Sequence, residues 1–464
     1  MQQALERRKV SILARRGLLA DDPELFARAA GRHTNPRQGY TSHTTSGGEL
    51  QRRFLSSIMD DLFGRTGSES GSKAKSTLQQ VASEGYPEID LIASQSDNLT
   101  YASPPTAVQS LGLDIESNDI GYVATIEIGS QNQTFRMLID SGSADTWVPS
   151  TACQACGSTH AQLGPSDSDT FTALSTPFSI QYGTGDVSGN LAIDNFEIAG
   201  LALTNYTFAV TTQESSDFSD DTVPFDGLMG LARSELSNAG QPTPIDALYA
   251  EGQVQAPVMG YHLGRIADGY NDGEVTFGGV DPAKYSGNIT EIDNVSQKGF
   301  WEAAIDQISV GGSSLGLKGR TAILDTGTTL IVAPEADANA VHAAIPGAKS
   351  DGQGGYTIPC TTTKQVAFTF GGVTFPIDTR DMLFLPVDPD NLLGECVSAI
   401  SAGNVGQRNE WLVGATFLKN VYFATNTQAN MIGLAHLNTT NTAPSASTSA
   451  NGTAATAADI ASAE

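Results

Sequence analysis

The sequence predicts an all-β protein made of two related lobes. Residues 109–437 consist of short strand-like runs separated by Gly, Asn and Asp turns, at a spacing typical of all-β proteins. The stretch FRMLIDSGSADTWVP at 135–149 matches RTAILDTGTTLIVAP at 320–334 with a shift of 185 residues. An apolar-apolar-Gly triplet at 228–230 recurs at 412–414 with a shift of 184. Two pairs that recur at almost the same period indicate two copies of one design.

The chain divides by composition into four regions. In residues 1–108, basic, apolar and Ser/Gly-rich stretches follow one another without the alternation typical of strands. The SPP at 103–105 would interrupt any regular secondary structure near the end of this region. Residues 109–288 form the predicted first lobe and residues 289–437 the second, with helix candidates at 245–252 and 335–345. Residues 438–464 are rich in Ser, Thr and Ala and lack the apolar mass for a core, which predicts a disordered tail.

Charge is distributed unevenly along the chain. Residues 1–59 contain ten Lys and Arg against five Asp and Glu, whereas residues 111–464 contain 12 against 39. A body this acidic repels nucleic acid and anionic membranes, so we expect neither as a partner. At low pH the carboxylates become protonated and only the few Lys, Arg and His charges remain. Positive self-repulsion is then limited, which suits an acidic environment. Solubility alone accounts for the composition equally well.

The four cysteines favour disulfides over a metal site. Cys153 and Cys156 form a C-x-x-C that is compatible with zinc or redox chemistry, but Cys360 and Cys396 lie 36 residues apart and no histidine pair completes a ligand set. Two local disulfides fit better, and we expect no metal and no cofactor.

N-glycosylation sequons agree with passage through an oxidising secretory route, so we expect a secreted protein, with the vacuole as the alternative location. The first residues show no apolar run of signal-peptide length, so a signal peptide is not visible in this sequence. No stretch approaches the roughly 18 apolar residues of a membrane span. The sequons begin at Asn98, Asn132, Asn205, Asn288, Asn294, Asn438 and Asn451.

Each copy of the repeat presents one aspartate, Asp140 or Asp325, after an apolar strand. A pseudo-two-fold axis would bring the two carboxyl groups face to face at the seam between the lobes. Two carboxyl groups a few ångströms apart cannot both ionise, so the pair shares one proton and supplies an acid and a base together. One member can take a proton from a water while the other hydrogen-bonds a carbonyl, which predicts amide hydrolysis without a covalent intermediate.

Hydroxyl residues follow each aspartate at matching positions. The hydroxyl groups of Ser141 and Thr326 can form hydrogen bonds to the opposite loop and hold the two lobes in register. Those of Ser143 and Thr328 can donate to the outer carboxylate oxygens.

The duplicated D-[ST]-G-[ST] motif, each copy followed by an apolar-apolar-Gly triplet, resembles that of the pepsin-type aspartic proteases and their secreted fungal members. The similarity runs from about Leu111 to Leu437 and includes YGTG at 182–185 and PFDGLMGLA at 224–232. The resemblance implies a bilobal pepsin-like fold with a central active-site cleft. It also implies an aspartic endopeptidase of acidic optimum that acts on polypeptides, with Asp140 and Asp325 as its catalytic pair.

The same resemblance implies binding residues and disulfides. Tyr182 resembles the flap tyrosine, held by the indole of Trp147, and Gly183 and Thr184 would bond the substrate backbone. Apolar side chains resemble the pocket wall on the acyl side of the scissile bond, so we expect a preference for large apolar residues there. The wall comprises Leu138, Phe218, Phe225 and Leu228, the loop glycines facing the substrate are Gly142 and Gly327, and the disulfides are Cys153–Cys156 and Cys360–Cys396.

Zymogens of this family carry a basic prosegment that blocks the cleft at neutral pH and leaves when carboxylates become protonated. Residues 1–108 match such a prosegment in position and in sign of charge. The resemblance therefore implies a monomeric enzyme that is inhibited by its own prosegment. An unrelated disordered tail is the alternative interpretation of this region.

Three rival functions compete with this interpretation. Residues 312–316 match G-x-S-x-G of serine hydrolases, but they lead into a strand instead of the required helix. A glycoside hydrolase also uses two carboxylates, but it has no reason to place them in duplicated turns. A catalytically inactive pepsin-like glycoprotein that binds peptides is the remaining alternative. Both aspartates, both glycines and the hydroxyls are present, which favours an active enzyme.

Overall fold

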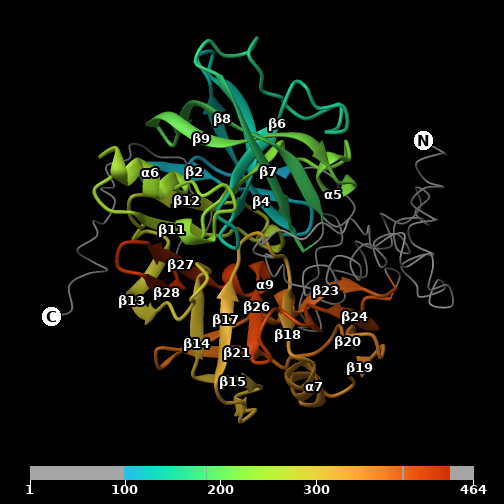
Figure 1. Ribbon diagram of the computed structural model, residues 1–464. Coiled ribbons are helices and arrows are strands. Elements are labelled where there is room, and N and C mark those ends of the chain that lie inside the picture. The colour runs from blue at the N-terminus through green and yellow to red at the C-terminus, as the bar shows by residue number, and fades with distance from the viewer. Residues whose placement is uncertain (1–98, 184, 389–390, 439–464) are drawn as a thin grey trace, which may run out of the picture.

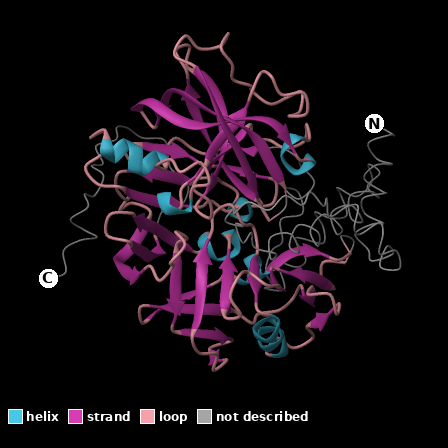
Figure 2. Cartoon of the chain, in the orientation of Figure 1, coloured by secondary structure: helices cyan, strands magenta, loops and turns pink. Residues whose placement is uncertain are grey.

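The computed structural model describes residues 99–183, 185–388 and 391–438. Strands dominate this part of the chain and build an upper and a lower lobe with a sheet between them (Figure 1; Figure 2). The prediction of an all-β, bilobal fold is confirmed. The predicted prosegment up to residue 98, nearly all of the predicted tail and Thr184 lie outside the described residues.

The first lobe is a nine-stranded sheet that curls on itself, because β4 pairs with both β5 and β8. Strand β1 lies within the region predicted as the prosegment and pairs with β3. In sheet order the strands are β1 (Leu99–Thr100), β3 (Asp114–Glu116), β4 (Gly121–Ile128), β5 (Gln133–Asp140), β10 (Gly227–Gly230), β6 (Thr146–Pro149), β9 (Leu201–Glu214), β8 (Asp186–Ile198) and β7 (Thr172–Gln181).

The second lobe contains three smaller sheets. The first has the order β14 (Glu302–Ile305), β17 (Arg320–Leu324), β26 (Glu410–Val413), β18 (Ile331–Ala333) and β25 (Ile400–Ala402). The second has the order β16 (Ser313–Ser314), β15 (Gln307–Val310), β21 (Val366–Phe370) and β22 (Val373–Pro376). The third has the order β19 (Lys349–Ser350), β20 (Tyr356–Pro359), β24 (Glu395–Ser398) and β23 (Leu383–Pro386).

A six-stranded sheet joins the lobes and takes strands from both predicted halves (Figure 1). The predicted boundary between residues 288 and 289 falls inside β13, an edge strand of this sheet. The sheet is therefore common to the two halves. Its order is β13 (Tyr285–Asp293), β28 (Met431–Leu437), β27 (Val421–Asn426), β11 (Val258–His262), β12 (Glu274–Phe277) and β2 (Ser110–Gly112).

The sequence repeat corresponds to one strand arrangement that occurs in both lobes. Strand β10 runs parallel to β5 and antiparallel to β6, and β26 runs parallel to β17 and antiparallel to β18. The loop after each aspartate therefore crosses the end of the returning triplet. A Cβ on Gly230 would lie 2.5 Å from the amide nitrogen of Asp145, and one on Gly414 would lie 2.6 Å from the carbonyl oxygen of Leu330. The crossing explains why each triplet ends in glycine.

Helices are short in the described part of the chain. The two helix candidates are present as α6 and α7. Helix α6 begins with a proline. The backbone N–H that proline lacks would have no partner within the helix at this position, so no hydrogen bond is lost. The helices are α5 (Ser216–Ser219), α6 (Pro244–Ala250), α7 (Glu335–Ala343), α8 (Thr379–Met382) and α9 (Ala415–Leu418), with 3₁₀ turns η2 (Ser234–Leu236) and η3 (Ile266–Asp268).

Candidate active site

Two strands of the same design present the two aspartates. Asp140 is the last residue of β5 and Asp325 follows β17, and buried apolar residues directly precede each aspartate. Burial on both faces suits central strands and anchors the carboxylate at the strand end. The two side chains are 6% and 9% exposed, so each is largely removed from solvent.

Matching hydrogen bonds orient both carboxylates. The Gly142 amide donates to Oδ1 of Asp140 at 2.8 Å, and the Ser143 hydroxyl donates to Oδ2 at 2.5 Å. In the second lobe, the Gly327 amide donates to Oδ1 of Asp325 at 2.8 Å, and the Thr328 hydroxyl donates to Oδ2 at 2.6 Å. The expected donation from hydroxyls to the outer oxygens is therefore present in both loops.

Ser141 and Thr326 link the two loops across the seam. The backbone amide of each residue donates to the hydroxyl of the other at 2.9 Å. The Ser141 hydroxyl donates to the Leu324 carbonyl at 3.0 Å, and the Thr326 hydroxyl donates to the Ile139 carbonyl at 2.7 Å. Because all these groups are buried, the four bonds hold the loops at one separation.

Each loop glycine faces the carboxylate of the opposite lobe. A Cβ on Gly142 would lie 2.5 Å from Oδ1 of Asp325, and a Cβ on Gly327 would lie 2.5 Å from Oδ1 of Asp140. No side chain fits at either position without displacing a carboxylate. The symmetry predicted from the repeat therefore brings the two aspartates to the same place.

The carboxyl group of Asp140 has a pKa raised well above its ordinary value. Burial is the largest cause, and the neighbouring Asp325 carboxylate is the next, while the hydrogen bonds from Ser143 and Gly142 act in the opposite direction. Two buried acids in this arrangement retain a proton between them. The site can therefore offer a proton donor and a proton acceptor side by side.

A hairpin made of β7 and β8 carries the residues predicted to form a flap. The indole N–H of Trp147 donates to the Tyr182 hydroxyl at 2.8 Å, as expected. The Tyr182 amide donates to the Gly185 carbonyl at 2.7 Å and closes the turn that contains Gly183. Thr184, the other predicted flap residue, lies outside the described residues.

The predicted wall residues gather in one apolar cluster with Trp147, and Tyr182 packs against it. Phe218 contacts both aromatic rings edge-on, with centroid distances of 5.4 Å to Trp147 and 5.3 Å to Tyr182. Phe218 therefore packs in the same cluster as the other three predicted wall residues. All four members are at most 4% exposed: Leu138, Phe218, Phe225 and Leu228.

Both predicted disulfides, Cys153–Cys156 and Cys360–Cys396, are present. Within the described ranges, no group of three or more His, Cys, Asp or Glu side chains is placed to hold a metal ion. The helices of the same ranges include none long and apolar enough to cross a bilayer.

Sequence reasoning missed a buried ionic cluster that links the lobes. Lys419 Nζ lies 2.6 Å from Asp119 Oδ2 and 3.0 Å from Asp381 Oδ1. The Arg265 guanidinium donates to Asp381 through Nε and Nη2 at 3.0 and 2.7 Å. No sequence signal pointed to this cluster, because Asp119 and Lys419 are 300 residues apart.

Fold and site together define a class of protein: two duplicated β lobes that bring one hydroxyl-supported aspartate each to a common seam. The family model described as eukaryotic aspartyl protease matches residues 121–437. The chain belongs to the eukaryotic aspartyl protease family.

Curated relatives agree with this membership. A probable aspartic-type endopeptidase CTSD of Arthroderma benhamiae is 37% identical over 337 residues, which is 72% of this chain and 64% of the relative. The chain thus spans less than two thirds of that relative's length. The aspartic-type endopeptidase ctsD of Aspergillus fumigatus is 30% identical over 84% of this chain and 80% of its own length. Rhizopuspepsin of Rhizopus chinensis is 33% identical over 70% of this chain and 80% of its own length.

Proposed function

We propose that the chain is an aspartic-type endopeptidase that hydrolyses peptide bonds with a water activated between Asp140 and Asp325. The observation that supports this most directly is the matched support of the two carboxylates. Each accepts one backbone N–H and one hydroxyl, and each lies against the loop glycine of the other lobe. Family membership supports the same activity.

The two carboxylates take different roles in this proposal. Burial and the neighbouring charge favour the proton on Asp140, which then hydrogen-bonds the scissile carbonyl oxygen. Asp325 accepts a proton from the water as that water attacks the carbonyl carbon. Asp140 gives its proton to the developing oxyanion. As the C–N bond breaks, Asp325 gives the proton that it took from the water to the leaving amine, and Asp140 takes a proton back from a hydroxyl of the intermediate as the carboxyl group of the product forms. No covalent intermediate forms.

Substrate preference follows from the cluster beneath the flap. An extended peptide would lie across the loops as an added strand, with backbone bonds to Gly142, Gly327 and the flap turn. The wall formed by Phe218 and its neighbours suits a large apolar side chain beside the scissile bond.

Regulation, location and assembly follow the same proposal. The basic residues of 1–98 would pair with the acidic body at neutral pH and release the cleft on acidification. We propose a monomeric zymogen that is secreted or delivered to the vacuole.

The test is cleavage of a denatured protein by the purified, acidified chain and by Asp140→Asn and Asp325→Asn separately. Each substitution removes one half of the acid and base pair, so we expect at least about a thousandfold loss of cleavage. The exposed Asp169 supplies a matched control, since Asp169→Asn makes the same chemical change far from the seam and retains activity.

Cleavage that survives in either dyad variant would remove the assignment of that aspartate. Peptide binding by the wild-type chain without cleavage would favour the inactive, peptide-binding alternative instead. A statine-type peptide, whose hydroxyl mimics the attacking water, should block the activity of the wild-type chain.

A further inference from the structure

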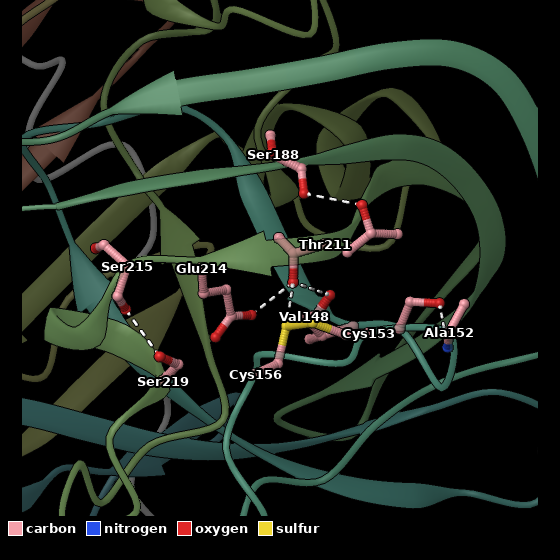
Figure 3. Close-up of a disulfide and its surroundings, with 11 residues drawn as sticks. Val148, Ala152, Cys153, Cys156, Ser188, Thr211, Glu214, Ser215 and Ser219 are labelled. Atoms are coloured by element: carbon pink, nitrogen blue, oxygen red, sulfur yellow. Dashed lines mark hydrogen bonds between the residues drawn. A yellow bond between two sulfur atoms is a disulfide. The ribbon is translucent and has the colours of Figure 1, made fainter. Parts of the chain in front are cut away.

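A small disulfide ring lies beside the end of β9, next to Thr211 and Glu214 (Figure 3). Cys153 and Cys156 are separated by two residues, both exposed. The two sulfurs differ in environment, because Cys153 is partly exposed while Cys156 is 1% exposed. A thiolate from solvent can therefore reach Cys153 much more easily than Cys156.

The Thr211 hydroxyl lies next to the buried sulfur. Its Oγ1 is 3.8 Å from Cys156 Sγ, 3.4 Å from the Val148 carbonyl oxygen and 2.6 Å from Glu214 Oε1 (Figure 3). A hydroxyl has one proton to donate and two lone pairs to accept with. The Thr211 hydroxyl donates to Glu214 Oε1. When Oε1 of Glu214 carries a proton, this bond can reverse: Thr211 then accepts from Glu214, and its own hydrogen can pass to the sulfur.

Glu214 is a buried acid to which the peptide-cleavage mechanism gives no role. It is 9% exposed, and its Oε2 has no hydrogen-bond partner among the described residues. Burial raises the pKa of this carboxyl to about 7, against a smaller opposing effect of the Thr211 hydrogen bond. Below that pH the side chain is a neutral carboxylic acid with a proton to donate.

We infer that Cys153 and Cys156 form a thiol–disulfide exchange site for a dithiol reductant, in which Glu214 protonates the buried leaving sulfur through Thr211. This site is separate from the peptidase dyad and does not depend on the proposed function. Without the relay, cleavage of the disulfide would create a thiolate in a buried place, where its charge is poorly solvated.

The exchange proceeds in two steps. A thiolate of the dithiol attacks Cys153 Sγ, the Cys153–Cys156 bond breaks, and the electron pair stays on Cys156 Sγ. That sulfur takes the Thr211 proton, and Thr211 takes the Glu214 proton. The second thiolate of the reductant then attacks the reductant sulfur of the mixed disulfide and releases the Cys153 thiolate. The Cys153 thiolate takes a proton from solvent, so that the protein gains two thiols while the reductant becomes a disulfide. Solvent also returns a proton to Glu214.

The experiment measures reduction of the folded full-length protein by dithiothreitol at pH 6.5. New thiols are blocked with an alkylating reagent, and each cysteine is quantified by peptide mass spectrometry. The Cys360–Cys396 disulfide is an internal reference, because its sulfurs belong to residues that are only 1% and 0% exposed. We expect Cys153 and Cys156 to be alkylated at least about tenfold faster than this reference pair.

Two near-isosteric variants test the relay. Glu214→Gln removes the acid, and Thr211→Val removes the hydroxyl, so each should slow reduction of the small ring about tenfold. Thr211→Ser keeps the hydroxyl and should react at nearly the wild-type rate. Mere loosening of the fold would speed exchange, and so a slower rate reports the missing proton transfer.

Equal reactivity of the two disulfides, or reaction of Cys153 only after unfolding, would overturn the exchange site. A wild-type or faster rate in both Glu214→Gln and Thr211→Val would overturn the relay.

Discussion

At the scale of single residues, the site is defined by which hydrogen each carboxylate oxygen accepts. Oδ1 of Asp140 accepts from the Gly142 amide, and Oδ2 accepts from the Ser143 hydroxyl. These bonds stabilise the ionised form, whereas burial and Asp325 stabilise the protonated form. The pKa of the pair thus depends on a balance that a single hydroxyl can shift.

Ser143→Ala tests this balance. Removal of a hydrogen bond that lowers the pKa of Asp140 should raise the upper apparent pKa of the dyad. The alkaline limb of the kcat/KM profile then moves to higher pH. Ser143→Thr keeps the donor, as Thr328 does in the other lobe, and should restore the profile. A lower rate with an unchanged alkaline limb in Ser143→Ala would contradict the assigned effect.

The described sequon asparagines differ in how exposed their side chains are. Asn132, Asn205 and Asn288 are exposed, whereas Asn294 is 7% exposed. The Asn294 amide donates to the Phe300 carbonyl and to Asn430, and its oxygen accepts two backbone N–H groups. A glycan on the Asn294 amide nitrogen would replace one of its two donated hydrogens and would need space that this buried side chain does not have.

We therefore expect glycans on the three exposed asparagines and an unmodified Asn294 when the protein is made in a eukaryotic secretory host. Glycopeptide mass spectrometry after enzymatic release in heavy-oxygen water would measure the occupancy of each site. Substantial occupancy at Asn294 would show that the native packing around it differs from the one described.

At the scale of elements, the flap hairpin of β7 and β8 is tied to β6 by one side-chain hydrogen bond. Trp147 lies on β6 and donates to Tyr182 at the end of the hairpin. Phe218 of α5 packs between both rings. The position of the hairpin end therefore depends on contacts among three separate elements.

Trp147→Phe keeps an aromatic ring and removes the donor. A lost hydrogen bond of about 1 kcal/mol corresponds to a loss of about fivefold in kcat/KM for a peptide substrate. Tyr182→Phe removes the acceptor and should cost a similar amount. If the bond itself matters, the double variant loses no more than either single variant. Fully additive losses would show that the two side chains act independently.

At the scale of the whole molecule, the lobes are joined by the six-stranded sheet, by the Ser141–Thr326 bonds and by the buried ionic cluster. Lys419 and Arg265 lower the pKa of Asp381 to about 2, although burial acts in the opposite direction. A carboxylate whose pKa falls on folding stabilises the native state above its ordinary pKa near 4. This stabilisation is lost as the pH falls from about 4 to about 2.

Asp381→Asn tests this link between the lobes. At pH 6 it leaves two buried cations short of an anion, and we expect a loss of about 3 kcal/mol in the free energy of unfolding. At pH 2 the native Asp381 is about half protonated and most of its stabilisation is already lost, so the loss should be much smaller. Urea unfolding at both pH values, in an Asp325→Asn background that prevents self-cleavage, measures the difference, with Asp169→Asn as the control. An equal loss at both pH values would contradict the electrostatic account.

The two-lobed β fold, the meeting of the two aspartates and the hydroxyl groups beside them could be predicted from the sequence. These features repeat with one period, and the chemistry of each copy is local, since Asp140 is supported by residues two and three positions away. The flap bond and the disulfides were reached through resemblance and are present in the structure.

The contacts between distant, non-repeating residues could be identified only in the folded structure. The pairing of Asp119 with Lys419, the placement of Phe218 between Trp147 and Tyr182, and the position of Glu214 near a disulfide depend on how the strands pack. Periodicity specifies which face a side chain takes, but it does not specify which distant polar group lies on the opposing face. The predicted boundary between the lobes falls within β13 for the same reason: β13 belongs to a sheet that both halves share, and a linear repeat does not predict a shared sheet.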